Sequence, residues 1–228
     1  MVFDELPVSA AEGCILAHSI GLLGKRLRKG VRLNKDHIDE LTRAGITHIS
    51  AARLQKGDIA EDAAAVALAK ALVPHPDQAG LRLGAAFTGR VNLIASSAGV
   101  VSQNVEQLIA LNSIDSMISL ATLPQYQQVS TGNLVGTVKI ISYGVASDKL
   151  QAACKLAQAA IKVLPPVARS ASLVVSGSNG GLGEKGVEAI RQRLDALNIS
   201  LMEVVTTPHQ TGAMANALKD ASGDLILM

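Results

Sequence analysis

The six residues from Gly181 to Gly186 have the types and spacing of a phosphate-binding loop. They read Gly-Leu-Gly-Glu-Lys-Gly, which fits G-x-G-x-x-G, and they stand between an expected strand and an expected helix. Glycines let backbone N–H groups approach a phosphate closely, and the start of a helix favours negative charge. Glu203, twenty residues after Gly183, stands at the offset of a ribose-binding carboxylate in dinucleotide-binding domains.

Three interpretations of this loop stay open. Residues 177–180 separate the expected strand from the first glycine of the pattern, whereas a dinucleotide loop follows its strand directly. Glu203 is followed by Val204 and Val205, which also suits a side chain that points into a sheet face. The segment is a dinucleotide site, a site for another anion, or a long connection. The candidate ligand-binding residues are Gly177, Ser178, Asn179, Gly180, Gly181, Gly183 and Lys185.

A second chemical feature is a basic run near the N-terminus. Six cations lie between Lys25 and Lys35. Such runs are typical of phosphate and nucleic-acid contacts, but single-strand binders also need aromatic stacking platforms, and the sequence has none nearby. A solvated hairpin is therefore the favoured interpretation, and we expect no nucleic-acid partner. A contribution to binding an anionic small molecule stays open.

The other reactive side chains form no recognisable set. The five histidines stand at no metal-ligand spacing from one another, from a cysteine or from a carboxylate, so we predict no metal site. Cys14 and Cys154 are far apart in the sequence, which suits a reducing cytosol better than a disulfide framework. We place Cys154 on the buried stripe of a helix, as an inert thiol. Catalytic residues stay unknown.

Composition narrows the class of protein. Hydrophobic residues make up 48% and charged residues 18%, so the chain can bury an ordinary core. Aromatic residues make up only 2%, so that core must be aliphatic. The formal charge of +2 favours no dedicated polyanion partner. No secretory signal and no apolar stretch of about 20 residues is present. We therefore expect a soluble, cytoplasmic protein without a membrane partner.

The first sixty to eighty residues predict two helices and a strand. A helix over residues 35–44 is capped by Asn34 and stopped by Gly45 in the left-handed conformation. Residues 46–50 alternate apolar and polar side chains, as a half-buried strand does. A second, alanine-rich helix is expected over residues 61–73.

The middle of the chain reads as a small β-rich module. Strands are expected over residues 91–94, 116–122 and 134–143, with a helix over 104–111 that Ser102 caps. A further helix is expected from Ser147, which caps it, to the Pro165-Pro166 pair. Its apolar stripe consists of Leu150, Cys154, Ala157, Ile161 and Leu164.

The last segment predicts a βαβαβ unit with a parallel sheet. Strands are expected over residues 173–176, 199–205 and 224–228, with helices over 187–197 and 211–221. Ligands of such sheets bind beyond the carboxyl ends of the strands. The sequence stops at the third strand, so we expect a partial, apparently truncated domain. Because exposed strand edges pair readily, a homodimer through this region is a hypothesis.

The fold class is therefore α/β, with N-terminal α+β segments and a small β-rich module linked to a C-terminal partial βαβαβ parallel-sheet domain. The expected domains are residues 1–80, the β-rich module over 81–146, a connecting helix and linker over 147–170, and the parallel-sheet domain over 171–228.

Two stretches resemble a known family. Residues 12–20, Glu-Gly-Cys-Ile-Leu-Ala-His-Ser-Ile, are similar to the "GRILAEDI" opening of MoeA-type molybdopterin biosynthesis proteins. Residues 27–46, with Gly30-Val31 and Ala44-Gly45-Ile46, resemble their "KGTVLTPADIALLAAAGI" segment. Residues 121–124 and 136–141 are similar to shorter MoeA-like proteins. Residues 171–228 resemble, in outline, the first half of a MogA/MoaB-like domain.

This resemblance implies a divergent protein of molybdenum cofactor biosynthesis. The implied ligand is molybdopterin, a phosphorylated pterin, or its nucleotide adduct, bound at the strand ends. If the complete protein is an enzyme, the resemblance implies a molybdenumtransferase-like reaction with molybdate and Mg²⁺. Two alternatives stay open: a Rossmann-like nucleotide-binding oxidoreductase domain, and a non-catalytic binding or scaffold module.

Overall fold

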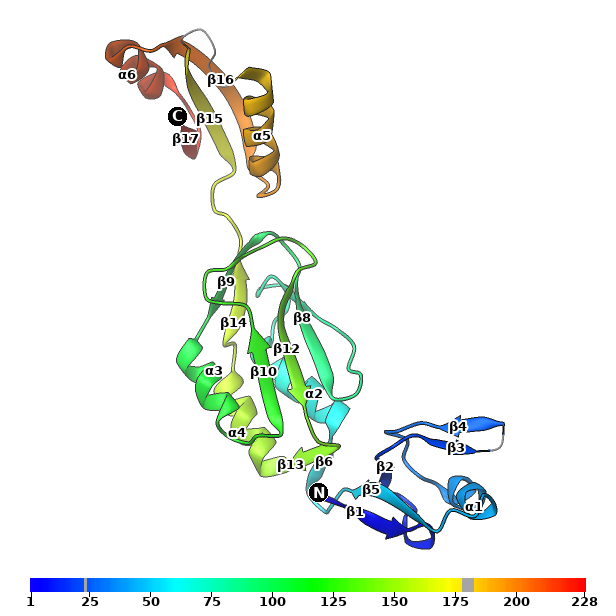
Figure 1. Ribbon diagram of the computed structural model, residues 1–228. Coiled ribbons are helices and arrows are strands. Elements are labelled where there is room, and N and C mark those ends of the chain that lie inside the picture. The colour runs from blue at the N-terminus through cyan, green and yellow to red at the C-terminus, as the bar shows by residue number, and fades with distance from the viewer. Residues whose placement is uncertain (23, 178–182) are drawn as a thin grey trace.

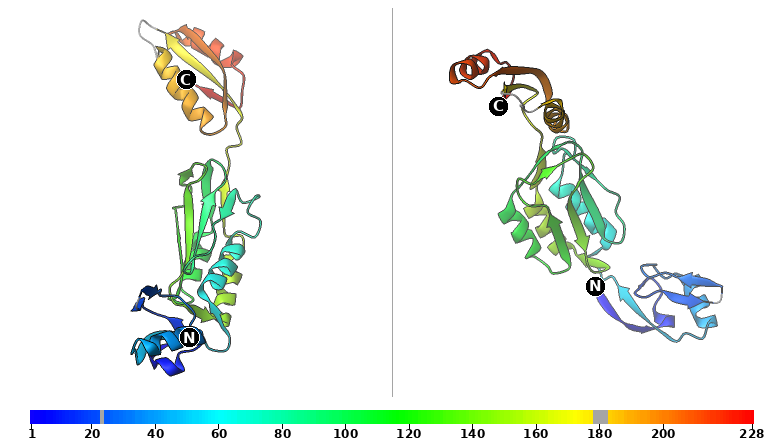
Figure 2. Two further views of the ribbon diagram at one scale, coloured as in Figure 1. Left: turned by 90° about the vertical axis from the view of Figure 1, so that its right-hand side faces the viewer. Right: turned by 45° about the horizontal axis from the view of Figure 1, so that its top comes forward.

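The computed structural model describes residues 1–22, 24–177 and 183–228. Three parts follow one another along an elongated molecule, with the N-terminal part at one end and the C-terminal part at the other (Figures 1 and 2). The described residues form six α-helices and several small sheets. The predicted mixture of helices and strands is confirmed. No helix in the described ranges combines the length and the apolar character needed to span a bilayer.

The N-terminal part is an antiparallel sheet with one helix. The sheet has the order β1-β5-β2, from β1 (Val2–Pro7), β5 (His48–Arg53) and β2 (Ile15–Leu16). A short 3₁₀ turn (Val8–Ala10) follows β1. A hairpin of β3 (Ile20–Leu22) and β4 (Lys25–Leu27) carries the basic run.

Helix α1 (Lys35–Arg43) forms where the sequence predicts it. The Asn34 side chain accepts a hydrogen bond from the His37 amide, and the His37 ring accepts one from the Asn34 amide. Gly45 has a φ of +75°, and the Ile46 amide returns to the Leu41 carbonyl. Because this closing bond uses Ile46, the next strand begins at His48, two residues later than predicted.

The middle part contains the largest core. Its main antiparallel sheet has the order β10-β12-β8-β7, and a second sheet has the order β11-β9-β14. The first consists of β10 (Ile118–Thr122), β12 (Leu134–Ile140), β8 (Arg90–Ala95) and β7 (Leu81–Leu83). The second consists of β11 (Gln128–Val129), β9 (Gly99–Gln103) and β14 (Ile161–Leu164).

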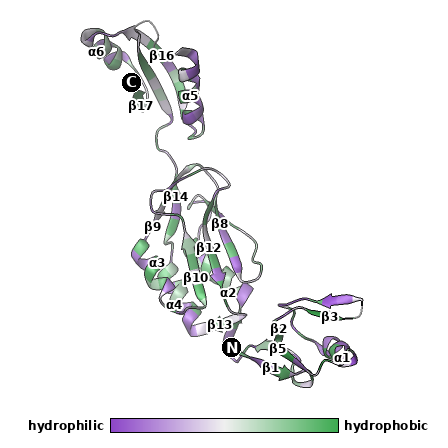
Figure 3. Ribbon diagram, in the orientation of Figure 1, coloured by the Kyte–Doolittle hydropathy of each residue, from purple (hydrophilic) through white to green (hydrophobic). Residues whose placement is uncertain are grey.

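Three helices accompany these sheets: α2 (Glu61–Leu72), α3 (Val105–Asn112) and α4 (Ser147–Ala157). Helix α2 contributes six buried residues, four of which are alanines, so it lies close to the strands. Figure 3 shows apolar residues concentrated on β10 and β12 in this part. The short strands β6 (Asp58–Ala60) and β13 (Gly144–Ala146) pair where the chain enters α2.

Three predictions for the middle part are wrong. The helix that begins at Ser147 ends at Ala157, and Ile161–Leu164 forms strand β14, paired with β9. Ile161 and Val163 are buried while the residues between and after them are exposed, so the stripe also fits a period of two. Ser147 makes no capping hydrogen bond there. Helix α3 is capped by Asn104 and not by Ser102.

Residues 147–164 pack as an integral part of the middle core. Helix α4 packs against α2 and α3, and its Ala153 and Ala157 are fully buried. The connection to the last part is shorter than predicted. It comprises residues 165–169, in which Val167 is 94% exposed.

The C-terminal part is the predicted βαβαβ unit. Strands β15 (Ser170–Gly177), β16 (Ser200–Pro208) and β17 (Leu225–Leu227) form a parallel sheet in the order β16-β15-β17. Helix α5 (Gly183–Asp195) connects β15 to β16 across the residues not described, and α6 (Thr211–Asp220) connects β16 to β17. The core between α5 and the sheet is small, and α6 buries no residue fully.

Candidate functional site

The carboxyl edge of the parallel sheet brings several chain ends together. Gly177 at the end of β15 lies beside Pro208 at the end of β16. Helix α5 begins at Gly183 and α6 at Thr211, and Figure 1 shows both starts near this edge. Exposed N–H groups at helix starts favour anions. The predicted site residues Ser178, Asn179, Gly180 and Gly181 lie outside the described residues.

A polar pair that the sequence did not reveal lies at the same edge. The Nδ1 atom of His209 is 3.0 Å from the Oγ atom of Ser176, so the ring and the hydroxyl share a hydrogen bond. His209 is exposed. Both residues come from strand ends, Ser176 from β15 and His209 directly after β16. The position of a histidine just after the second strand of a parallel pair was the available signal.

The two described glycines of the predicted site differ in what a side chain would meet. A Cβ atom on Gly177 would lie 3.0 Å from the Cγ2 atom of Thr206, so packing against β16 already favours glycine there. Gly183 has a φ of +61°, and a Cβ atom there would meet nothing within 4 Å. Among the described residues nothing covers the position of a side chain at Gly183, whereas Gly177 is a packing residue at the strand end.

The structure does not bring Lys185 to the hollow that Ser176 borders. Lys185 is the third residue of α5 and borders a shallow groove with Glu184 and Glu188 along the helix. Ser176 borders a different hollow of about 510 Å³, whose other walls include Arg193 and Met228. Arg193 is thus the cation of α5 that lines the hollow, and the sequence prediction missed it.

Glu203 is engaged in the fold and not at the ligand edge. Its Oε1 atom accepts hydrogen bonds from the Ser172 hydroxyl at 2.8 Å and the Ser222 amide at 3.1 Å. The hydrogen bond from Ser172, followed by that from Ser222, lowers the pKa of the Glu203 carboxyl. Glu203 lies five residues before the end of β16, or about 17 Å along the strand. Through its bond with the Ser222 amide, Glu203 connects the segment after α6 to the sheet.

The order of the strands also bears on the dinucleotide interpretation. In dinucleotide-binding domains the third strand lies beyond the second, in the order 3-2-1. Here the third strand, β17, pairs with the first, β15, which gives the order 2-1-3 of other doubly wound sheets. In this order the crevice lies beyond the ends of β15 and β17. Strand order and Glu203 therefore both disfavour a ribose-binding role for that carboxylate.

The remaining reactive side chains are dispersed. Among the described residues, no group of three or more histidine, cysteine or acidic side chains could hold a metal ion. Both cysteines are free, Cys14 buried and Cys154 half-buried. Burial raises the pKa of the Cys154 thiol, which disfavours the nucleophilic thiolate. Tyr143 and Glu61, in contrast, share a large cavity with the basic hairpin.

Comparison with known proteins yields one match. The model of a domain of unknown function, DUF8806, matches residues 5–53. This range contains the N-terminal sheet apart from the first three residues of β1, together with the basic hairpin and α1. It covers about a fifth of the chain. No curated protein and no solved structure matches the chain.

Proposed function

We propose that this protein binds molybdopterin, a phosphorylated pterin, at the carboxyl edge of its parallel sheet and acts in molybdenum cofactor biosynthesis. One structural observation carries the anion-binding half of the proposal. The start of α5 and the Ser176–His209 pair lie at the edge where ligands of parallel sheets bind. The resemblance of residues 12–20 and 27–46 to MoeA-type proteins supports the choice of a pterin.

The groups at this edge suit the two ends of such a ligand. Backbone N–H groups at Gly183 and the following residues donate to the phosphate, and the α5 dipole stabilises its charge. The Ser176 hydroxyl and the His209 ring supply further hydrogen bonds. The hollow lined by Val175, Leu227 and Arg193 accommodates the planar ring, because it combines apolar walls with one cation.

In this proposal the C-terminal part is a MogA/MoaB-like domain, and the protein is cytoplasmic. If the chain takes part in catalysis, the reaction is a transfer that involves the pterin dithiolene, molybdate and Mg²⁺. We assign none of its described residues to those ions, because no group of suitable ligands is present among them.

The proposal is tested by the ligand that the protein retains. The full chain is purified from a host that synthesises molybdopterin and is then denatured, and the fluorescence of the released pterin is measured per mole of protein. We expect pterin with the unmodified protein and at least about a tenfold loss with the Ser176→Ala/His209→Ala variant, because hydrogen bonds to the charged phosphate are removed.

The matched control is His48→Ala. His48 is also exposed and also bonds a neighbouring hydroxyl, that of Thr47, but it lies in the N-terminal sheet. This variant should retain the full amount of pterin. A protein that carries no pterin and binds none when pterin is added contradicts the proposal, as does an equal loss in the control.

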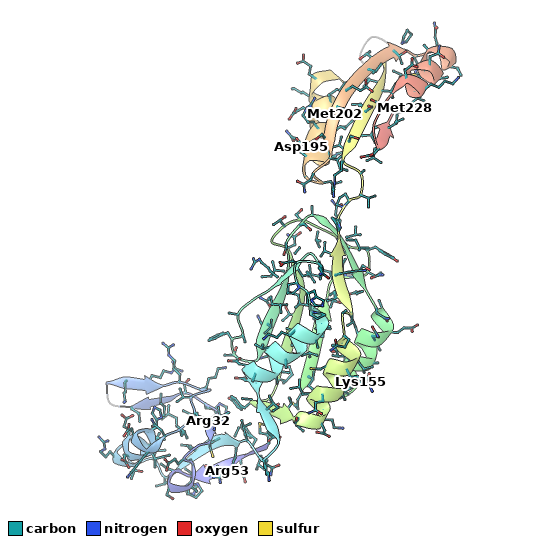
Figure 4. All side chains as sticks on the ribbon, turned by 180° about the vertical axis from the view of Figure 1, so that it is seen from behind. Arg32, Arg53, Lys155, Asp195, Met202 and Met228 are labelled. Atoms are coloured by element: carbon teal, nitrogen blue, oxygen red, sulfur yellow. The ribbon has the colours of Figure 1, made fainter. Side chains whose placement is uncertain are left out.

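We also propose a homodimer through the β17 edge. β17 pairs only with β15 among the described strands, and Ile226 and Met228 are 44% and 80% exposed. Figure 4 shows where Met228 lies in this part. Exposed apolar strand edges favour pairing. Sedimentation over a wide concentration range should show a dimer that Ile226→Lys disrupts, whereas a monomer at every concentration contradicts it.

A further inference from the structure

A cavity lies between the basic hairpin and the middle part, far from the parallel sheet. Its volume is about 970 Å³, which is the size of pockets that hold a nucleotide-sized ligand. One wall consists of residues 26 and 28–30 with Ser19. The other consists of residues 87–88, Lys139, Ile141, Tyr143 and Glu61. Figure 1 shows the base of the β3–β4 hairpin nearest to the lower end of the middle part, with the tip of the hairpin pointing away from it.

The cavity concentrates positive charge. Four cations line it, Arg26, Arg28, Lys29 and Lys139, against the single carboxylate of Glu61. The three ion pairs found among the described residues include none of these four cations. Cations held together without acidic partners repel one another, so an anion bound between them would lower the energy of the arrangement.

The backbone holds the cationic wall in place. The Lys29 amide donates to the Ser19 hydroxyl at 3.0 Å, and the Gly30 amide donates to the Leu16 carbonyl at 2.8 Å. Gly30 has a φ of +85°, which lets the chain turn directly after the cations. The adjacent cation Lys25 is tied to Glu40 and faces α1. The hairpin therefore separates its cations into a structural one and a set that faces the cavity.

The opposite wall combines an exposed ring with a strained turn. Phe87 is 76% exposed, in a chain with very few aromatic residues. Thr88 and Gly89 form a two-residue turn in which both φ angles are positive, +48° and +71°, and such angles are unusual for a β-branched residue. The Lys139 ammonium donates to the Thr88 carbonyl, and the Asp62 carboxylate accepts from the Gly89 amide. Strain of this kind often accompanies binding sites.

The floor of the cavity joins the two parts of the molecule. The Tyr143 hydroxyl donates to the Ala17 carbonyl at 3.1 Å, across the boundary between the N-terminal and the middle parts. The Tyr143 carbonyl accepts from the Glu61 amide. Burial, followed by the charge of Asp62, raises the pKa of the Glu61 carboxyl, so the negative charge on this carboxyl is disfavoured. The cavity is thus built from both parts and biased toward anions.

We propose that this cavity is a second ligand site, for a small molecule that carries two or more phosphate groups and a planar aromatic ring. The phosphates lie between the hairpin cations and Lys139, and the ring stacks on Phe87. This site is independent of the one at the parallel sheet. It gives a role to the basic run, for which the sequence favours a solvated hairpin and leaves open a contribution to anion binding.

Calorimetry with ADP tests the proposal, with pyrophosphate and adenosine as the separate halves of the probe. The unmodified protein should bind ADP and, more weakly, pyrophosphate. Arg26→Ala/Arg28→Ala should weaken both by at least about tenfold, because each removed guanidinium supplies charge-assisted hydrogen bonds. Phe87→Ala should weaken the affinity for ADP by about fivefold and leave the affinity for pyrophosphate unchanged.

Two control variants test whether the ligand binds in this cavity. Lys35→Ala/Arg43→Ala removes the same charge from α1, outside the cavity lining, and should leave both affinities unchanged. His209→Ala changes only the proposed pterin site and should likewise have no effect here. Thermal unfolding of each variant verifies that it is folded.

Tyrosine fluorescence provides a second readout. The chain has no tryptophan and two tyrosines, so Tyr126→Phe leaves Tyr143, in the cavity, as the only such fluorophore. Pyrophosphate, which does not absorb in this range, should change its emission with the affinity that calorimetry measures. Absence of binding, an equal loss in the α1 control, or loss through His209→Ala would each overturn the proposal. Tighter binding of a single-stranded oligonucleotide than of ADP would do so as well.

Discussion

The middle part and the C-terminal part are both mixtures of strands and helices, but they bury their apolar residues very differently. In the middle part, α2 alone contributes six buried residues to a core that continues through both sheets and α4. In the C-terminal part, Leu194 is the one buried residue of α5, and α6 has no buried residue. Met202 and Met228 are exposed there (Figure 4). Similar local sequence patterns therefore give a well-buried core in the middle part, whereas the C-terminal part leaves apolar side chains exposed to solvent.

The largest expected effect is in the middle core. Leu68 of α2 is fully buried, and Leu68→Ala should lower the free energy of unfolding by about 3 kcal/mol, because it removes apolar contacts and leaves a cavity. Leu225→Ala in β17, where the leucine is 37% exposed, should lower the free energy of unfolding by less than about 1 kcal/mol. Denaturant titration measures both. Comparable losses would remove the contrast between the two parts.

The contact between β9 and β14 should be almost as sensitive. A Cβ atom on Gly99 would collide with the carbonyl of Leu164 and lie 2.9 Å from the Val163 side chain. That carbonyl cannot move freely, because it belongs to a paired strand. Gly99→Ala should therefore lower the free energy of unfolding by about 1–3 kcal/mol. Gly21→Ala in β3, where nothing lies within 4 Å, is the matched control and should change little. An unaffected Gly99→Ala protein would show that β14 is loosely held.

In the C-terminal part, a substitution of the same type should stabilise. Gly212 is the second residue of α6, and a Cβ atom there would meet nothing within 4 Å. Gly212→Ala should stabilise this part by about 0.5–1 kcal/mol, because alanine loses less backbone entropy in a helix. Hydrogen exchange of the β15 and β16 amides is the measurement. Unchanged or faster exchange would mean that α6 does not support the sheet.

Acid should affect the C-terminal part first. Hydrogen bonds from the Arg169 and Ser170 amides lower the pKa of Asp224, and those from Ser172 and Ser222 lower that of Glu203. A lowered carboxyl pKa gives stability that is complete above its ordinary value, 3.8 for Asp224 and 4.5 for Glu203, and is lost as the pH falls through the folded-state pKa. Glu61 in the middle part has a raised pKa, so its protonation favours the folded state as the pH falls.

Hydrogen exchange at about pH 6 and about pH 3.5, corrected for intrinsic rates, should therefore show protection lost in β15–β17 while β8 and β12 stay protected. Glu203→Gln should reduce this difference. Loss of protection in both parts at the same pH would contradict the assignment.

The sequence predicted best those elements whose local signals agree with one another. Asn34 and Gly45 delimit α1 because their side-chain and backbone preferences act within a few residues. The order of elements in the C-terminal part was also predicted, since alternating apolar runs and amphipathic stretches mark a βαβαβ unit. The extent of α4 was predicted wrongly, because Ile161 and Val163 fit both the spacing of a helix and the alternation of a strand. Only their pairing with β9 makes this segment a strand.

The candidate sites depended more on distant contacts. Gly177 and Gly183 were predicted from local spacing, and the structure places both at the strand edge. The position of His209 directly after the second strand was a local signal. Its hydrogen bond to Ser176, and the roles of Arg193 and Glu203, follow from which strands become neighbours. The cavity at the basic hairpin joins residues more than one hundred positions apart, which a reading along the chain cannot bring together.

The linker over residues 165–169 has a consequence for communication within the molecule. Two adjacent prolines and the almost fully exposed Val167 join parts whose apolar clusters are separate. Cooperativity between two ligands requires a free-energy coupling carried by shared structure. With so little shared structure, a phosphate ligand at the hairpin and a pterin at the sheet should each titrate as though the other were absent.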